Sequence, residues 1–279
     1  MPLLLSFPVF ANWTGDTKAD TKTVTGSGSV SSENNKSDTL PEGVTQNWLN
    51  SLTDEKGNKI APEEDPEGDS FQRKTFNGLS ASSRFGFAVN TAGDVNGDGF
   101  DDVIIGSYLY SSGIGRAYIY YGGLIMNTVA DIIITGLGSG YNFGYSVSTA
   151  GDVNGDGYSD VIIGAPGYST NTGRAYIYFG GLNMNTGTFL TLSGEAAGNF
   201  FGGSVSSAGD VNGDGYSDVI AGAYGYSSNT GRAYVYYGGA SMNNVVDVTI
   251  TGAAINYNLG FSVSNAGDFN GDGYSDVIA

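Results

Sequence analysis

The sequence predicts an all-β fold, a β-propeller built from four-stranded blades. Three observations support this prediction. A unit of 58 residues recurs without insertion, as its loop starts at Asp94, Asp152, Asp210 and Asp268 show. Each complete unit contains four short strand-like segments, the arithmetic of one propeller blade. Gly is abundant, with 46 residues, and aromatic residues make up 13%, which favours short strands and tight turns over helices.

Composition divides the chain into three regions. Residues 1–11 form an apolar run that is too short to span a bilayer. With Val9 and Ala11 at its end, the run has features of a secretory signal-peptide remnant; an apolar terminus without a targeting role is the alternative. Residues 12–70 are expected to be a mostly disordered linker, because residues 12–47 are polar and lack periodicity. Within this linker, Thr45–Leu52 fits one or two turns of helix. Residues 71–279 carry the repeats.

The four segments of the first unit illustrate the expected strands. The first is Phe85–Val89, and the second is the β-branched run Val103–Ile105, which predicts a strand buried on both faces. The third, Arg116–Tyr120, alternates small or aliphatic residues with Tyr, and the fourth is Asp131–Ile134. Residues 73–76 match a fourth segment with no unit ahead of it, which predicts a strand that closes the last blade.

About three and a half units are present, so we expect a partial ring in this chain. The sequence stops at Ala279, within the second segment of the fourth unit. A chain end inside a buried strand would leave backbone donors and acceptors unpaired. We therefore expect this chain to be part of a longer protein.

An Asp-rich loop of nine residues links the first segment of each unit to the second. Oxygen-bearing side chains occupy loop positions 1, 3, 5 and 9, and Gly occupies positions 4 and 6. This pattern suits Ca²⁺, which takes about six to eight oxygen ligands, while Gly permits the tight turn. We predict four Ca²⁺ ions, one per repeat. The alternative is a set of Asx-rich turns without metal. An EF-hand is excluded because position 12, Ile105 in the first copy, is not Glu.

Charge and composition exclude several classes of function. The net charge of −17 argues against nucleic acid as a partner, because binding phosphates depends on Lys and Arg. The absence of Cys and His excludes disulfides, zinc clusters and imidazole catalysis. Glu195 is the single Glu within the repeats, and no motif activates a Ser nucleophile. We therefore predict no catalysis and no transmembrane segment in this stretch.

The repeats resemble the FG-GAP repeat of the integrin α-subunit β-propeller. The second unit matches in full, with Phe143-Gly144 as the FG, Gly164-Ala165-Pro166 as the GAP, and the Asp-rich loop between them. The near-identity of neighbouring units is more similar to bacterial secreted members of this family than to an animal integrin. By this resemblance the fold is a propeller, often of seven blades, and its Asp-rich loops bind cations on the face opposite the ligand.

The resemblance also implies a ligand set for each loop, from the side chains at positions 1, 3, 5 and 9 and the backbone carbonyl at position 7. Position 3 is Asn where integrins usually have Asp, which should weaken cation binding. The implied metal ligands are Asp94, Asn96, Asp98, Phe100 and Asp102; Asp152, Asn154, Asp156, Tyr158 and Asp160; Asp210, Asn212, Asp214, Tyr216 and Asp218; and Asp268, Asn270, Asp272, Tyr274 and Asp276.

We expect a secreted or surface-exposed, calcium-stabilised propeller that acts in adhesion or ligand binding, with a protein or polysaccharide as the ligand. The alternative is a non-catalytic accessory propeller of a larger secreted carbohydrate-active enzyme. Ligand-binding candidates are the Tyr-, Ser- and Asn-rich loops opposite the Asp-rich loops, although ordinary solvated loops would have this composition too. These are Tyr108–Gly115, Pro166–Gly173, Tyr224–Gly231, Leu137–Asn142, Glu195–Asn199 and Ala253–Asn258. The recurrent Arg116, Arg174 and Arg232 favour a structural contact within each blade over an anion site.

Overall fold

The computed structural model describes residues 74–78, 82–124 and 127–279. They lie in one compact unit, Arg73–Ala279. The predictions for the apolar run 1–11 and the linker 12–70 concern residues outside this described part, and they stay predictions.

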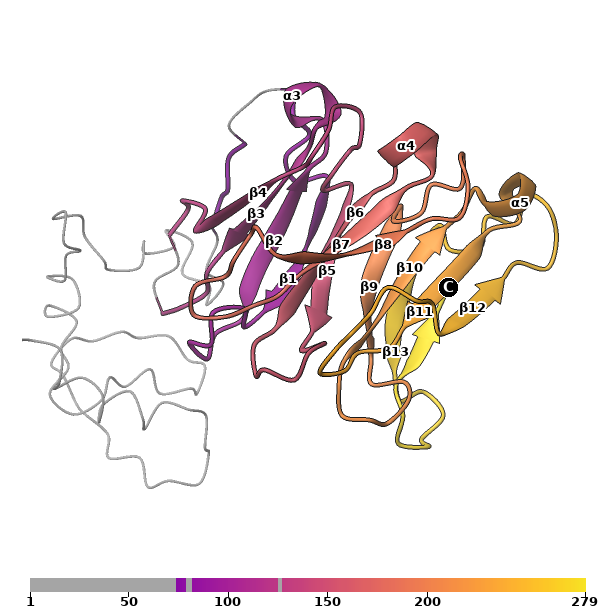
Figure 1. Cartoon of the computed structure of the whole chain (residues 1–279). Coiled ribbons are helices and arrows are strands. Elements are labelled where there is room, and N and C mark those ends of the chain that lie inside the picture. The colour runs from indigo at the N-terminus through magenta and orange to yellow at the C-terminus, as the bar shows by residue number, and fades with distance from the viewer. Residues whose placement is uncertain (1–73, 79–81, 125–126) are drawn as a thin grey trace, which may run out of the picture. The chain divides into compact units, whose positions relative to one another are not determined.

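The described residues form three four-stranded antiparallel sheets and one two-stranded sheet, each built from strands consecutive in the sequence (Figure 1). The predicted all-β, propeller-like fold is confirmed. The first blade contains β1 (Ala88–Gly93), β2 (Asp102–Ser107), β3 (Arg116–Tyr120) and β4 (Ile132–Thr135). The second contains β5 (Ser146–Gly151), β6 (Asp160–Ala165), β7 (Arg174–Tyr178) and β8 (Phe189–Ser193). The third contains β9 (Ser204–Gly209), β10 (Asp218–Ala223), β11 (Arg232–Tyr236) and β12 (Val248–Thr251), and the half-blade contains β13 (Ser264–Gly267) and β14 (Asp276–Ile278).

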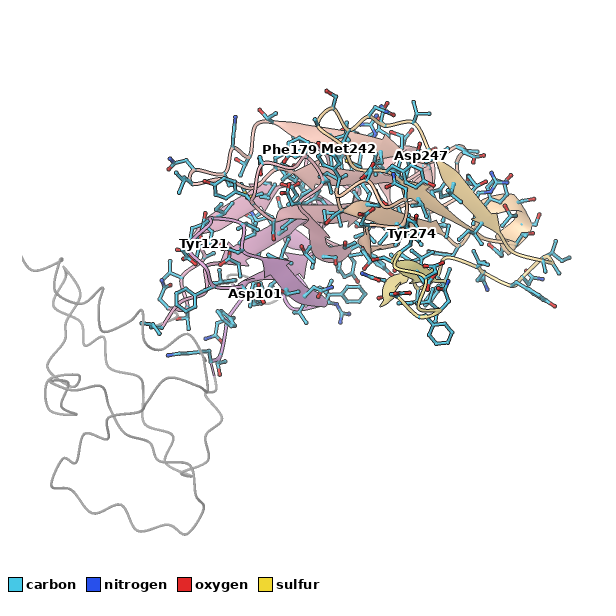
Figure 2. All side chains as sticks on the ribbon, turned by 90° about the horizontal axis from the view of Figure 1, so that it is seen from below. Asp101, Tyr121, Phe179, Met242, Asp247 and Tyr274 are labelled. Atoms are coloured by element: carbon cyan, nitrogen blue, oxygen red, sulfur yellow. The ribbon has the colours of Figure 1, made fainter. Side chains whose placement is uncertain are left out.

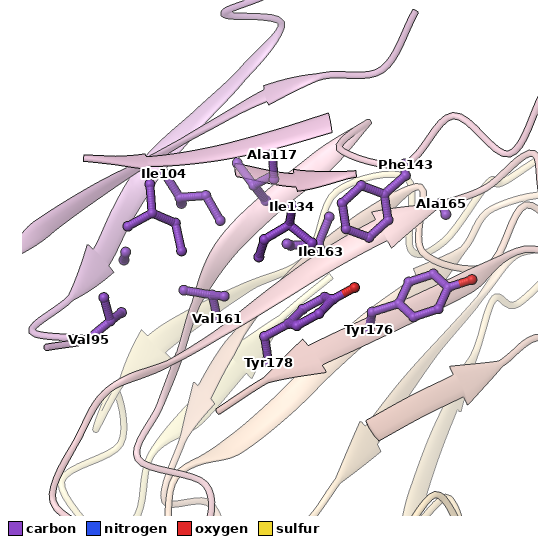
Figure 3. Packing of buried hydrophobic residues seen from close by; sticks show 13 residues of the cluster. Val95, Ile104, Ala117, Ile134, Phe143, Val161, Ile163, Ala165, Tyr176 and Tyr178 are labelled. Carbon is purple, nitrogen blue, oxygen red and sulfur yellow. The ribbon is translucent and has the colours of Figure 1, made fainter. Parts of the chain in front are cut away.

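The second strand of each complete blade packs on both of its faces, as the β-branched runs predicted. Val161 and Ile163 of β6 lie in a core shared with the first blade (Figure 3), whereas Ile162 lies in a core shared with the third. All three side chains are fully buried. Each such side chain contributes ~1.5–3 kcal/mol through the hydrophobic effect. The blades are therefore held together mainly by apolar contacts between successive sheets.

The first strand of each blade begins later than its sequence suggested. Phe85–Val89 was expected to be a strand, but β1 starts at Ala88. The reason is Gly86, whose φ of +80° is incompatible with an extended strand, so that Phe-Gly forms a turn instead. Gly144 repeats this conformation with φ of +81°, and a Cβ there would collide with the carbonyl oxygen of Arg116.

The prediction that residues 73–76 close the last blade stays a prediction, because the blade that they would complete is not among the described residues. Residues 74–78 carry no strand assignment, because none of the described strands pairs with them. Phe76 packs instead against the ring of Tyr120, with 4.5 Å between the ring centroids. This aromatic contact places the segment beside the third strand of the first blade.

Three one-turn helices lie in segments that the sequence predicts to be loops. They are α3 (Tyr110–Gly113), α4 (Tyr168–Asn171) and α5 (Tyr226–Asn229), and they lie at one end of the blades (Figure 1). Each contains residues with left-handed φ, such as Ser169 at +46° and Thr170 at +53°. The same strained turn therefore recurs once per complete blade.

Candidate functional site

The Asp-rich loops lie at the end of the blades opposite the one-turn helices. Figure 2 views this end, where Asp101 of the first loop and Tyr274 of the fourth are labelled. Each loop joins the first strand of a blade to the second, as predicted. The strand pair β1–β2 ends with Gly93 opposite Asp102, after a register shift. This shift places position 9 beside the start of its own loop.

Position 1 holds the loop in shape through its carboxylate. Asp94 accepts hydrogen bonds from the backbone N–H groups of Gly97 (2.7 Å), Asp98 (3.0 Å) and Gly99 (2.8 Å). Asp152, Asp210 and Asp268 accept the equivalent three bonds. The loop is thus an Asx-type turn stabilised by a charged acceptor.

Positions 3 and 5 are linked to each other in every loop. Asn96 Nδ2 donates to Asp98 Oδ2 over 3.0 Å, and Asn96 Oδ1 accepts from the Asp98 backbone N–H over 2.9 Å. Asp98 Oδ1 accepts from the backbone N–H of Phe100 at 3.0 Å. Both side chains therefore turn their oxygens toward the inside of the loop.

Position 9 carries a buried carboxylate in the first three loops, whereas Asp276 of the fourth is only partly buried. Asp160 is fully buried, and its two oxygens accept hydrogen bonds from Val153 N (2.9 Å) and Gly180 N (2.8 Å). Burial raises the pKa of Asp160 to about 7; the two backbone donors oppose this shift, and the carboxylates of Asp156 and Asp152 add to it. Burial likewise raises the pKa values of Asp102 and Asp218. The carboxylates at positions 1, 5 and 9 therefore repel one another within each of these loops.

The donor chemistry of the loops fits a hard cation, because every side chain directed inward offers oxygen. In the part of the chain that the structure describes, no group of three or more Asp, Glu, His or Cys side chains is close enough to hold a metal ion. The carboxylate oxygens accept hydrogen bonds from backbone N–H groups instead. The assignment of the twenty predicted ligand residues accordingly stays a prediction.

Position 7 has a role that the sequence did not reveal. A Cβ on Gly97, at position 4 of the first loop, would meet the ring of Tyr158, at position 7 of the second. The ring of Tyr216 lies in the same way against Gly155 of the loop before it. Ser159 N also donates to the Asp94 carbonyl over 2.9 Å. Successive loops are thus in direct contact, and the identical spacing of Gly and aromatic residues was the available signal.

The three recurrent arginines make structural contacts within their own blades, as expected, and these contacts leave terminal guanidinium nitrogens available, as the Arg232–Glu195 pair shows. The guanidinium of Arg116 lies 3.7 Å from the ring centroid of Tyr110, and Arg174 and Arg232 repeat this distance with Tyr168 and Tyr226. Such cation–π contacts are stabilising. The Nε of each arginine also donates to a hydroxyl on the neighbouring fourth strand, over 2.9 to 3.2 Å.

The two sets of loops expected to bind a ligand lie against each other. Asn142 N donates to Gly113 O over 2.8 Å, and Phe200 N donates to Asn171 O over 2.8 Å. Each of these links between blades is therefore hydrogen-bonded to the one-turn helix of the preceding blade. The two sets therefore lie side by side at this end of the blades.

Within the part of the chain that the structure describes, no helix is long and apolar enough to cross a membrane.

Comparison with known proteins identifies the repeat. The FG-GAP repeat family matches residues 85–120, 143–178 and 201–236, which are the first three strands of each complete blade. Among curated proteins, integrin alpha-5 of Xenopus laevis is 34% identical over 164 residues, 54% of this chain. Integrin alpha-PS2 of Drosophila melanogaster is 31% identical over 234 residues, or 76%, and integrin alpha-V of Gallus gallus is 32% identical over 212 residues, or 70%.

The matched regions span only 16 to 20% of the length of these relatives. The relatives are animal proteins, and the expected bacterial origin stays a prediction. Repeat matches, sequence similarity and the four-stranded sheets agree with one another. The chain therefore carries three FG-GAP repeats, and its four-stranded sheets are the blades of a partial β-propeller similar to that of integrin alpha subunits.

Proposed function

We propose that this chain is a calcium-binding propeller module that acts in adhesion or ligand binding, outside the cell or at its surface. The observation that supports the calcium proposal is the unfavourable environment of the position 9 carboxylate in the first three loops. Burial, and repulsion by the carboxylates at positions 5 and 1, raise its pKa, in the second loop to about 7. A bound cation would relieve this repulsion and favour the charged form.

The residues that would hold the ion are the oxygen donors at positions 1, 3, 5 and 9, together with the carbonyl at position 7. In the first loop these are Asp94, Asn96, Asp98, Asp102 and the carbonyl of Phe100. Calcium would neutralise charge and rigidify the loop. Because each loop touches the next blade, binding would stabilise the blade junctions as well.

The ligand-binding proposal rests on similarity to proteins named as integrin alpha subunits. The candidate surface is the end formed by the one-turn helices and the links between blades. We propose a protein ligand and no catalytic role, since the loop carboxylates are engaged with backbone donors. No observation favours a polysaccharide ligand or an accessory role in a carbohydrate-active enzyme.

Calcium binding is tested by isothermal titration calorimetry on metal-free protein, with native mass spectrometry to count the ions. We expect up to four ions, and we expect Asp98→Asn to weaken binding at the first loop. Asp101→Asn is the matched control, because Asp101 is also an exposed loop carboxylate but lies at position 8, outside the proposed ligand set. Absence of binding at millimolar calcium, or equal losses in both variants, would overturn the assignment.

A further inference from the structure

The third blade contains a carboxylate held by two donors. Arg232 Nη1 lies 2.8 Å from Glu195 Oε1, the one ion pair among the described residues. The hydroxyl of Tyr234 donates to the same oxygen over 3.0 Å. Glu195 belongs to the link between β8 and β9, so its side chain reaches from the link to the third strand of the next blade.

The second blade contains the same two donors but no carboxylate. Arg174 and Tyr176 lie 58 residues before Arg232 and Tyr234, and residue 137 in the corresponding link is Leu. Arg174 is positioned as Arg232 is, 3.7 Å from the ring centroid of Tyr168 and with Nε donating to Ser193 Oγ over 3.2 Å. The donors of the second blade are therefore pre-organised in the same way.

The hydroxyl of Tyr176 is the unsatisfied group of this site. The side chain is 1% exposed, packed against Phe143 (Figure 3), and its buried oxygen has no hydrogen-bond partner. Burial raises the pKa of this hydroxyl, while the side chain of Arg174 approaches it as a donor and lowers the pKa by hydrogen bonding and by its positive charge. Arg174 can only donate, so it offers no acceptor for the hydroxyl proton. A buried polar group without a partner is uncommon and costly, so a ligand that accepts its proton gains affinity.

We propose that Arg174 and the Tyr176 hydroxyl form a binding site for a carboxylate, supplied by an acidic side chain of a partner protein. Glu195 shows what the pair of donors accepts in the neighbouring blade. The source is a protein side chain because the carboxylate that fills the equivalent pair of donors in the third blade is a Glu side chain. A docked partner also adds further contacts, which offset the repulsion from the net charge of −17. The proposal deepens the binding function proposed above by naming the ligand chemistry, and it does not depend on calcium.

The third blade shows that a buried Tyr hydroxyl can reach a carboxylate at the surface. Tyr234 is 2% exposed, yet its hydroxyl donates to Glu195 in the link. Leu137, at the position equivalent to Glu195, is exposed. The site lies at the end of the blades that carries the links and the one-turn helices. This is the surface proposed above for ligand binding.

The test is an NMR titration in saturating calcium that follows the Nε–Hε signals of the three arginines. The probe is N-acetylglutamate α-amide, and N-acetylglutamine α-amide is its neutral control. We expect a saturable shift of the Arg174 signal with a millimolar dissociation constant, and none with the glutamine compound. The Arg232 signal should stay in place, because Glu195 already occupies its site.

Two surface variants serve as matched controls. Leu137→Glu should place a carboxylate of the protein itself in the site and so abolish the Arg174 shift. Glu195→Gln should remove the carboxylate bound to Arg232 and make the Arg232 signal respond to the probe. Tyr176→Phe should weaken binding several-fold while retaining the arginine. An unresponsive Arg174 in the wild type, or a shift that persists in Leu137→Glu, would overturn the proposal. Calcium binding measured separately distinguishes this failure from failure of the metal assignment.

Discussion

Replacing Leu137 with Glu should stabilise the protein, because it supplies the carboxylate that the second blade lacks. The Tyr176 hydroxyl is buried without a partner, a state that costs about 1–3 kcal/mol. An exposed ion pair with Arg174 adds roughly 0–1 kcal/mol. Ordering the Glu side chain opposes these terms by up to about 1.5–2 kcal/mol. Leu137 is exposed, so its removal costs little, and the net expectation is about 1 kcal/mol of added stability.

Thermal or urea unfolding of wild type, Leu137→Glu, Tyr176→Phe and the double variant measures this effect as a double-mutant cycle. A gain of about 1 kcal/mol corresponds to roughly 2–4 °C in Tm for a domain of this size. The coupling between the introduced carboxylate and the Tyr176 hydroxyl should be at least about 0.5 kcal/mol. Leu137→Gln is the isosteric control and should stabilise less. Equal stability of Leu137→Glu and wild type, or no coupling to Tyr176, would refute the reasoning.

Three further predictions address the loops, the blade junctions and the aromatic core. Chelation of calcium with EGTA should lower Tm, since the loop carboxylates repel one another without a cation, and an unchanged Tm would count against the metal proposal. Gly144→Ala should destabilise by more than about 1 kcal/mol, because its φ is positive and its Cβ would meet the Arg116 carbonyl. Gly157→Ala, also at positive φ but with open space around it, is the control and should cost less in urea unfolding. Burial raises the pKa values of Tyr178 and Tyr236 above the ordinary 10.0, so the unfolded chain ionises first and stability should fall as pH rises above that value. Absorbance at 295 nm should then show a group of tyrosines that ionise only on unfolding, and smooth titration of every tyrosine near pH 10 would contradict this.

Much of the fold follows from local sequence pattern. The β-branched run at residues 161–163 predicts a strand buried on both faces, and the structure places alternate side chains in the two neighbouring cores. The third strands begin at the predicted arginines, such as Arg116. These strands could be predicted from the sequence because alternation of side chains, β-branching and Asx-type turns each depend on only a few neighbouring residues. The constant spacing of 58 residues then predicts the same elements in every blade.

The candidate site was only partly predictable. The oxygen-bearing positions of each loop were visible in the sequence. The burial of position 9 was not, because it depends on where β2 packs, and neither was the ring of Tyr158 against Gly97 of the preceding loop. Recurrence of Arg116 indicated a structural role, but its partner Tyr110 required the one-turn helix to be in place.

The repeat, its strands and the oxygen-rich loops can be recognised in the sequence alone, because each depends on neighbouring residues. The contacts between successive blades become visible only in the folded chain. The turn at Gly144 depends on the close approach of the Arg116 backbone from the blade before it. Likewise, Glu195 can bind Arg232 and Tyr234 only because its link lies beside the third strand, and Leu137 at the equivalent position makes no such contact. Such contacts join residues that are distant along the chain, so no local pattern encodes them.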